Sequence, residues 1–157
     1  LEYNYYPKGK DSTYRNFKTV TRIRQNLFRS AYHQVQYEYF VRDYATKNAR
    51  DGAGSETLSN RADRRNRLRY KVGGTVKKAL LSVENDFYRN DSNDARQDFY
   101  DYDVWKITNS ISGNATKKLY LSSGFAFERK NYRERKVNQI TAEARYDDKY
   151  TMTAGAS

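Results

Sequence analysis

Four basic residues stand at every second position of one short stretch, and this spacing could support anion binding. An extended strand sends alternate side chains to opposite faces, so the four would form one row on one face. Like charges in one row repel each other and require carboxylates or a bound anion, and rings of Arg and Lys favour anions in pores. Glu84 and Asp86, in the following stretch, could supply part of the counter-charge. The row consists of Arg65, Arg67, Arg69 and Lys71.

The same parity argument extends the anion-binding surface to other stretches. Arg22, Arg24 and Lys106 occupy the polar positions of their own alternating segments, so we expect them to face the same space as the row. Aromatic rings beside such cations could stack against sugars. The tyrosines assigned to this role are Tyr100, Tyr102 and Tyr120.

Other kinds of site find little support. His33 lies just after an expected short turn and shares the apolar parity of its segment, which does not suit a catalytic base. The acidic stretch 90–94 could hold calcium through carboxylate and amide oxygens, but its spacing fits no defined calcium loop. The chain has no cysteine, which excludes thiolate chemistry. We therefore predict no catalytic residue, no metal and no cofactor.

Alternating apolar and polar residues define the elements that would position these side chains. The expected strands are joined alternately by tight turns and by longer polar segments, and the tight turns lie at 28–30, 77, 113–116 and 147–148. The longer segments are 45–63, 89–98 and 129–136. A partial strand at 1–6 precedes the others. The expected strands cover 14–27, 31–44, 65–76, 78–88, 99–112, 118–130, 136–146 and 149 onward.

Composition adds an apparent contradiction. The chain has 157 residues, 31% of them charged, a net charge of +11 and a mean hydropathy of −1.12, which suits a very polar or disordered protein. Its 16 tyrosines and 15% aromatic content argue against disorder. A membrane barrel reconciles these values, because only one face of each strand meets lipid.

The segment 119–130, LYLSSGFAFERK, is typical of one class of protein. With the alternation of short and long connections, it resembles the strands of Gram-negative outer-membrane β-barrels. The resemblance implies an all-β, antiparallel up-and-down transmembrane barrel in the outer membrane, in contact with lipid and lipopolysaccharide, with its long loops outside the cell. Aromatics near the long-loop end would form an interfacial girdle. These are Tyr37, Tyr39, Tyr44, Phe87, Tyr88, Phe99, Tyr100, Tyr102, Trp105, Phe125 and Phe127.

We expect residues 1–157 to form one domain with about eight visible strands. The partial strand at the start, and a last strand that stops without the usual terminal aromatic residue, predict a segment of a larger barrel. Further strands or further copies of the chain would complete its wall.

The predicted function is a pore or export conduit for anionic cargo, either anionic polysaccharide or small anions, through a basic lumen. One alternative is an outer-membrane barrel that translocates or assembles surface proteins. The strand sequences of such barrels have a similar pattern. A second is a soluble ligand-binding β-barrel, in which the charged face would lie outside. Nucleic acid is not an expected partner, because the positive charge is spread over alternating strands and is not gathered in one patch.

Overall fold

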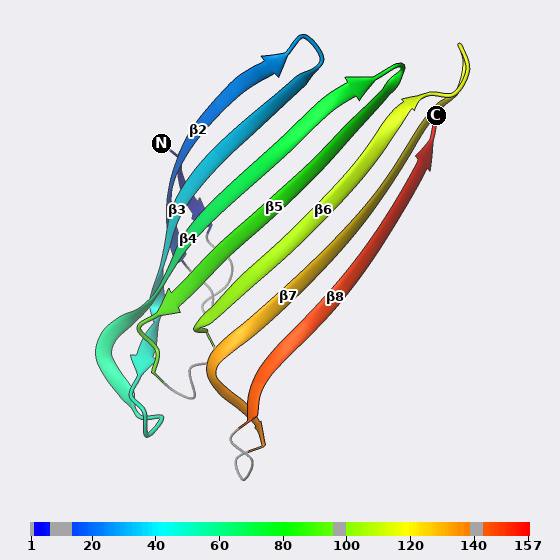
Figure 1. Cartoon of the computed structure of the whole chain (residues 1–157). Coiled ribbons are helices and arrows are strands. Elements are labelled where there is room, and N and C mark those ends of the chain that lie inside the picture. The colour runs from blue at the N-terminus through cyan, green and yellow to red at the C-terminus, as the bar shows by residue number, and fades with distance from the viewer. Residues whose placement is uncertain (1, 7–13, 96–99, 139–142) are drawn as a thin grey trace.

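Eight strands form a single antiparallel sheet in the computed structural model, which describes residues 2–6, 14–95, 100–138 and 143–157 (Figure 1). Each strand pairs with its neighbours in the chain, so the order in the sheet is β1 to β8 without a crossover. The strands are β1 (Glu2–Tyr6), β2 (Tyr14–Phe28), β3 (Ala31–Arg50), β4 (Glu56–Val76), β5 (Ala79–Ser92), β6 (Tyr102–Asn114), β7 (Tyr120–Asn138) and β8 (Glu143–Ala156).

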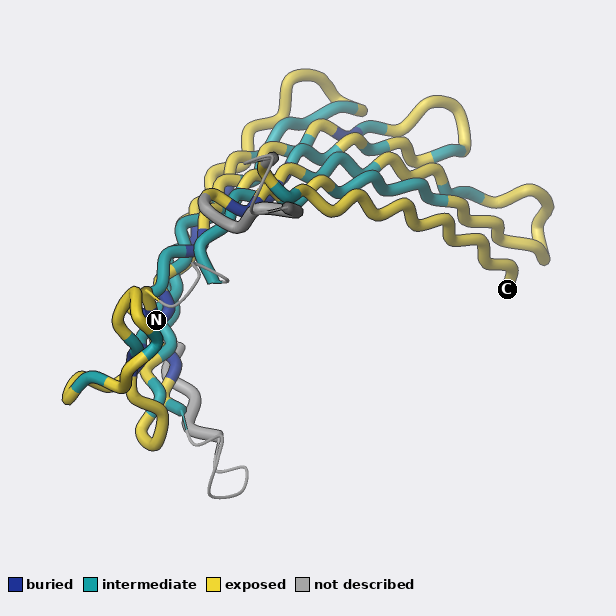
Figure 2. Tube along the Cα trace, turned by 90° about the horizontal axis from the view of Figure 1, so that it is seen from below, coloured by how far each residue is buried: buried dark blue, intermediate teal, exposed yellow. Residues whose placement is uncertain are grey.

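The sheet is strongly curved but open, as the end-on view in Figure 2 shows. Among the described residues β1 and β8 do not pair with each other, so the sheet does not close into a barrel. The expectation of an all-β antiparallel meander is confirmed. The described part of the chain contains no helix that is long and apolar enough to cross a membrane.

Tight turns join β2 to β3, β4 to β5 and β6 to β7 at one end of the sheet, as predicted (Figure 1). Lys77 adopts a left-handed backbone with φ 56°, which lets β4 reverse directly into β5. Gly74 faces the neighbouring turn, where a Cβ would lie 2.7 Å from the backbone oxygen of Ser30. This close approach requires glycine at that position.

The polar segments 45–63 and 129–136 are not loops, and that prediction was wrong. β3 continues to Arg50 and β4 starts at Glu56, so the two strands extend as a polar ribbon with a short turn at its tip. β7 likewise runs through 129–136 to Asn138. Polar side chains are compatible with strand pairing where both faces meet water, so the alternation is lost although the ladder continues.

The ribbon joins the rest of the sheet through a bulge in β3. Asp43 pairs with Ala62, but the next pair is Asn48 with Asn60, so four residues of β3 lie opposite one residue of β4. A bulge bends its strand and increases the local twist.

The predicted turn at 147–148 is also wrong. β8 is continuous from Glu143 to Ala156, so the expected seventh and eighth strands are largely one strand. Asp147 and Asp148 pair with Lys130 and Arg129, and Arg129 Nε donates to Asp148 Oδ1 at 2.8 Å. Cross-strand charge matching therefore outweighs the turn preference of the Asp-Asp pair.

Candidate anion-binding face

The strand register assigns every paired side chain to one of two faces, because residues directly opposite each other in a sheet point the same way. We call the face that contains Arg67 the polar face and the face that contains Leu68 the apolar face. Among the described residues that the register pairs across strands, eleven cations lie on the polar face: Lys18, Arg22, Arg24, Arg42, Arg65, Arg67, Arg69, Lys71, Lys106, Lys130 and Lys149. The carboxylates placed on it are Glu38, Asp63, Glu84, Asp86, Glu128 and Asp147.

Side chains on the polar face are crowded, although no second layer of described elements covers the sheet. Asp86 is only 2% exposed and Gln36 only 5%, whereas Ile23 and Met152 on the apolar face are 68% and 81% exposed. Side chains converge on the concave side of a curved sheet and spread apart on the convex side. The polar face therefore lines the concave side of the sheet in Figure 2.

The predicted row Arg65 to Lys71 lies on this face, and two of its members are neutralised there. Arg67 forms a two-pronged ion pair with Asp86, with Nε 2.8 Å from Oδ1. Arg69 Nε lies 3.2 Å from Glu84 Oε1. Glu84 and Asp86 thus supply the counter-charge that the row requires.

Arg65 takes a different environment, between two aromatic rings. Its guanidinium carbon lies 5.6 Å from the ring centroid of Phe40 and 5.1 Å from that of Tyr88. Its Nε is buried without a hydrogen-bond partner among the described residues. For Arg65, attraction to the ring faces replaces part of what a carboxylate provides elsewhere.

The predicted cations outside β4 also lie on the polar face. Arg22 Nε donates to the Gln36 side-chain oxygen at 3.0 Å, and the Arg24 guanidinium stacks 3.8 Å from the Tyr32 ring centroid. Lys106 Nζ is 3.9 Å from Glu128. The seven predicted cations therefore share one surface, but their compensation by carboxylates differs from strand to strand.

The three predicted tyrosines are not together. Tyr102 lies on the polar face, and Lys130 Nζ sits 3.7 Å from its ring centroid. Tyr100 stacks under Arg61 at 3.3 Å, between β5 and β6. Tyr120 begins β7 at the tight-turn end, far from the other two along the strands. Only Tyr102 and Tyr100 therefore accompany charged side chains at the long-connection end.

The two aromatics that flank Tyr102 on the polar face were missed as members of the site. Tyr88 and Tyr132 flank Tyr102, with ring centroids 6.2 and 6.1 Å from it. Tyr88 was expected in an outward girdle, together with Tyr44 and Tyr102, but the register places all three on the polar face. Their even numbers, shared with the polar positions of their strands, were the available signal. Phe99 of the expected girdle lies outside the described residues.

A second missed cluster clamps the base of the β3–β4 ribbon. Arg61 forms a two-pronged bond to Asp63, with Nε to Oδ1 at 3.1 Å and Nη2 to Oδ2 at 2.8 Å. The Tyr44 hydroxyl donates to Asp63 Oδ2 at 3.2 Å. Both partners of the ion pair are buried, so this cluster is a structural clasp. Its sequence signal was an opposite-charge pair two residues apart.

The acidic stretch 90–94 is engaged with arginines. Arg133 Nη2 donates to Asp91 at 2.6 Å, and Arg50 Nε lies 3.3 Å from Asp94. No group of three potential metal ligands occurs among the residues that the structure describes. His33 contacts the Gln25 side chain at 3.0 Å.

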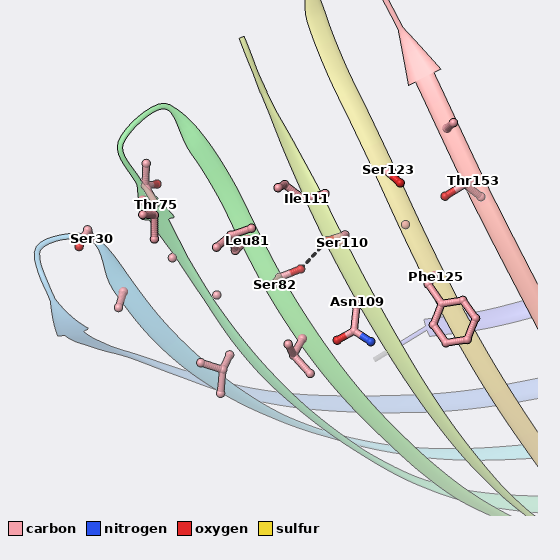
Figure 3. Close-up of a pocket in the computed structure, with 18 of the residues that line it drawn as sticks. Ser30, Thr75, Leu81, Ser82, Asn109, Ser110, Ile111, Ser123, Phe125 and Thr153 are labelled. Carbon is pink, nitrogen blue, oxygen red and sulfur yellow. Dashed lines mark hydrogen bonds between the residues drawn. The ribbon is translucent and has the colours of Figure 1, made fainter. Parts of the chain in front are cut away.

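An uncharged hollow of about 960 Å³ lies near the tight-turn end (Figure 3). Its lining comes from both faces and includes Ser82 and Ser110, which share a hydrogen bond of 2.7 Å, together with Leu81, Ile111 and Phe125. Because no lining residue carries a charge, the hollow adds nothing to anion binding.

The apolar face carries a band without charged residues. The band covers 68–76 on β4, 79–87 on β5 and 105–113 on β6, which is nine residues on each strand. A strand crosses a membrane with about 9–11 residues. Large exposed apolar side chains on this face are Phe17, Ile23, Val35, Tyr37, Leu68, Tyr70, Val72, Val76, Leu81, Val83, Phe87, Trp105, Ile111, Leu121, Tyr146, Tyr150 and Met152.

Charged residues of the apolar face gather beyond this band, towards the long connections. Arg89 Nε donates to Asp103 at 2.8 Å, and Arg129 pairs with Asp148 across β7 and β8. Trp105 and Phe127 meet edge to face near the border of the band, with centroids 5.8 Å apart.

Comparisons with known proteins identify no relative: no protein-family model matches the chain, and no curated protein or solved structure matches it.

Proposed function

We propose that the chain forms part of the wall of an outer-membrane β-barrel that conducts anionic cargo. The observation that carries this proposal is the division of one sheet into an apolar face with a charge-free band and a concave face on which the described, paired residues include eleven cations against six carboxylates. A soluble protein has no reason to expose seventeen large apolar side chains on one face. Lipid contact explains that face, and an aqueous lumen explains the other.

The surplus of positive charge supports anions as the cargo. Arg67 and Arg69 are paired with carboxylates, but Arg65 and Lys149 have no ion pair with any described carboxylate. A cleft lined by one sign of charge, with apolar walls behind it, concentrates ions of the opposite sign. Anionic polysaccharide and small anions both suit this surface, and further strands or copies would close the wall around it.

Conductance across a planar bilayer tests the proposal on the full protein. Under a salt gradient the unmodified barrel should pass anions more readily than cations. The triple variant Arg65→Gln, Lys130→Gln, Lys149→Gln removes charges that do not hold the Arg67 and Arg69 pairs, and its anion preference should fall clearly. The triple variant Arg29→Gln, Lys117→Gln, Lys118→Gln removes as much charge at the tight turns, outside the polar face, and should keep most of the preference.

Two results would contradict the proposal. Cation selectivity of the unmodified barrel would show that the polar face does not govern what passes. A protein that stays in the aqueous phase during detergent phase partitioning would favour a soluble ligand-binding barrel. A protein translocator would show a third behaviour, in which deletion leaves a client protein off the cell surface and anion permeability is unchanged.

A further inference from the structure

Positive charge on the polar face is compensated unevenly. On β5 to β8 the row through Asp86 alternates in sign, as Asp86, Lys106, Glu128 and Lys149. On β2 and β3 the same row contains Arg22 and Gln36. The next row towards the tight turns contains Arg24 and Gln34 on these strands. In these two rows β3 therefore carries the neutral amides Gln34 and Gln36, whereas β5 carries the carboxylates Glu84 and Asp86.

Arg22 and Arg24 are held in place by neutral partners. Gln36, itself buried, accepts from Arg22 Nε, and this bond leaves both terminal amino groups of Arg22 without a partner among the described residues. The Arg24 guanidinium carbon lies 3.8 Å from the Tyr32 ring centroid, and its nitrogens have no hydrogen bond or ion pair among the described residues. A guanidinium fixed by one bond or one stacked ring loses less freedom when it binds an anion.

A third cation faces the two arginines across β3. Lys71 on β4 is directly opposite Gln34, which is directly opposite Arg24 on β2. Neighbouring strands are about 4.8 Å apart, so the backbones of Arg24 and Lys71 lie roughly 10 Å apart on either side of Gln34. Arg69 holds Glu84, the carboxylate opposite Lys71. Glu38, the nearest carboxylate on β3, lies 3.4 Å from Lys18.

We propose that Arg22, Arg24 and Lys71, with Gln34 between them, form a discrete subsite for a hydroxylated carboxylate, such as one acidic unit of a sugar chain. The guanidinium groups bind the carboxylate through charge-assisted hydrogen bonds. The Gln34 amide offers both a donor and an acceptor, which matches a neighbouring hydroxyl group. The subsite rests on the proposed function, because it names the chemical class of the cargo, but direct binding tests it separately.

Isothermal titration of the full chain in detergent micelles tests the subsite, with trigalacturonate as the acidic probe and maltotriose as the neutral one. Trigalacturonate should bind at least about tenfold more tightly than maltotriose or acetate. The double variant Arg22→Gln, Arg24→Gln should lose about tenfold or more in affinity for trigalacturonate, because charged hydrogen bonds are lost. The double variant Lys117→Gln, Lys118→Gln removes the same charge at the β6–β7 turn and should change the affinity less than about twofold.

A charge-conserving variant distinguishes binding at a site of defined geometry from attraction by the overall positive charge of the face. Arg22→Lys with Arg24→Lys keeps the net charge but loses the planar fork and the stacked ring, so affinity should still fall several-fold. Full retention of affinity in this variant would overturn the subsite. So would equal losses in the Arg22→Gln, Arg24→Gln variant and the turn control. Acetate binding as tight as that of trigalacturonate would show a site for small anions and would likewise overturn it.

Conductance measured on the same preparations keeps this inference apart from the proposed function. Anion selectivity with no effect of the two arginines on trigalacturonate binding would overturn the subsite and leave the conduit standing. Arginine-dependent binding without anion selectivity would support the subsite and contradict the conduit. Circular dichroism of each variant confirms that the β-structure is retained before its affinity is compared.

Discussion

The two faces of this sheet are made by the same strands, yet different interactions stabilise them. Arg67 and Leu68 are adjacent in β4. Arg67 enters a crowded network with Asp86, whereas Leu68 is half exposed on a band without charges. Charged side chains on the polar face are stabilised by ion pairs within the protein. The stability of the apolar face depends on whether water or lipid surrounds it. Stability measurements should therefore separate the faces, because only the apolar face should respond to lipid.

The largest effect should come from placing a charge on the apolar band. Val72→Arg, in the middle of the 68–76 band on β4, should destabilise the folded protein in lipid vesicles by about 3 kcal/mol, since a cation on the lipid face near the bilayer midplane costs roughly that much. Urea titration in vesicles, followed by heat-modifiable gel migration, measures it. Thr151→Arg adds the same side chain on the polar face and should cost much less. Equal costs at the two positions would remove the distinction between the faces.

The next largest effect should come from breaking the buried pair on the polar face. Asp86→Ala leaves Arg67 without its carboxylate and should cost about 2–3 kcal/mol, somewhat below the value for a fully buried pair because Arg67 is partly exposed. The loss should be similar in detergent and in lipid. The double variant Asp86→Ala, Arg67→Met should recover part of the stability. A loss that appears only in lipid would contradict our assignment of this face to water.

A smaller effect is expected at Gly74, where the apolar side of β4 meets the neighbouring turn. Gly74→Ala would put a Cβ against the Ser30 backbone oxygen, and such overpacking typically costs about 1–3 kcal/mol. Gly52→Ala is the matched control, because nothing lies within 4 Å of its added Cβ. Chemical denaturation of both variants gives the comparison, and a Gly74→Ala protein as stable as the control would show that the turn is free to shift.

The smallest effect should come from the hydroxyl pair near the tight turns. Ser110→Ala removes one hydrogen bond to Ser82 and should cost about 0.5 kcal/mol, because the freed hydroxyl can bond to water. Ser82→Ala with Ser110→Ala should cost no more than the single change. A loss above about 1.5 kcal/mol would mean that the pair belongs to a larger network.

Most of what could be predicted from the sequence came from the odd or even position of each residue along its strand, because this position decides the face on which a side chain lies. Alternation assigned all seven candidate cations to one face, because a two-residue period depends only on counting along a strand. It also contained the correct reading of β8. Ala144, Tyr146, Tyr150 and Met152 are all even-numbered, so the same parity holds on both sides of 147–148, with Asp148 as the one charged residue in the series. We predicted a turn at 147–148 because Asp-Asp favours turns. Alternation alone would have predicted one continuous strand.

Pairing between strands could not be predicted in the same way. Which carboxylate neutralises Arg67 depends on the register of β4 against β5, and no local pattern in either strand gives it. The polar ribbon at 45–63 was missed because alternation disappears where both faces meet water. The same reason hid Arg61 and Asp63, whose partners Tyr44 and Tyr100 come from distant parts of the chain.

The bulge at the base of the β3–β4 ribbon has a mechanical consequence. A two-stranded ribbon behaves as a lever, and bending concentrates where its ladder is interrupted, between Asp43 and Asn48. Tyr44 and Asp63 bridge that interruption, so their hydrogen bond resists rotation of the lever about its root. A force on the tip of the ribbon, residues 51–55, would therefore act mainly on the strands at its base, at the edge of the concave surface.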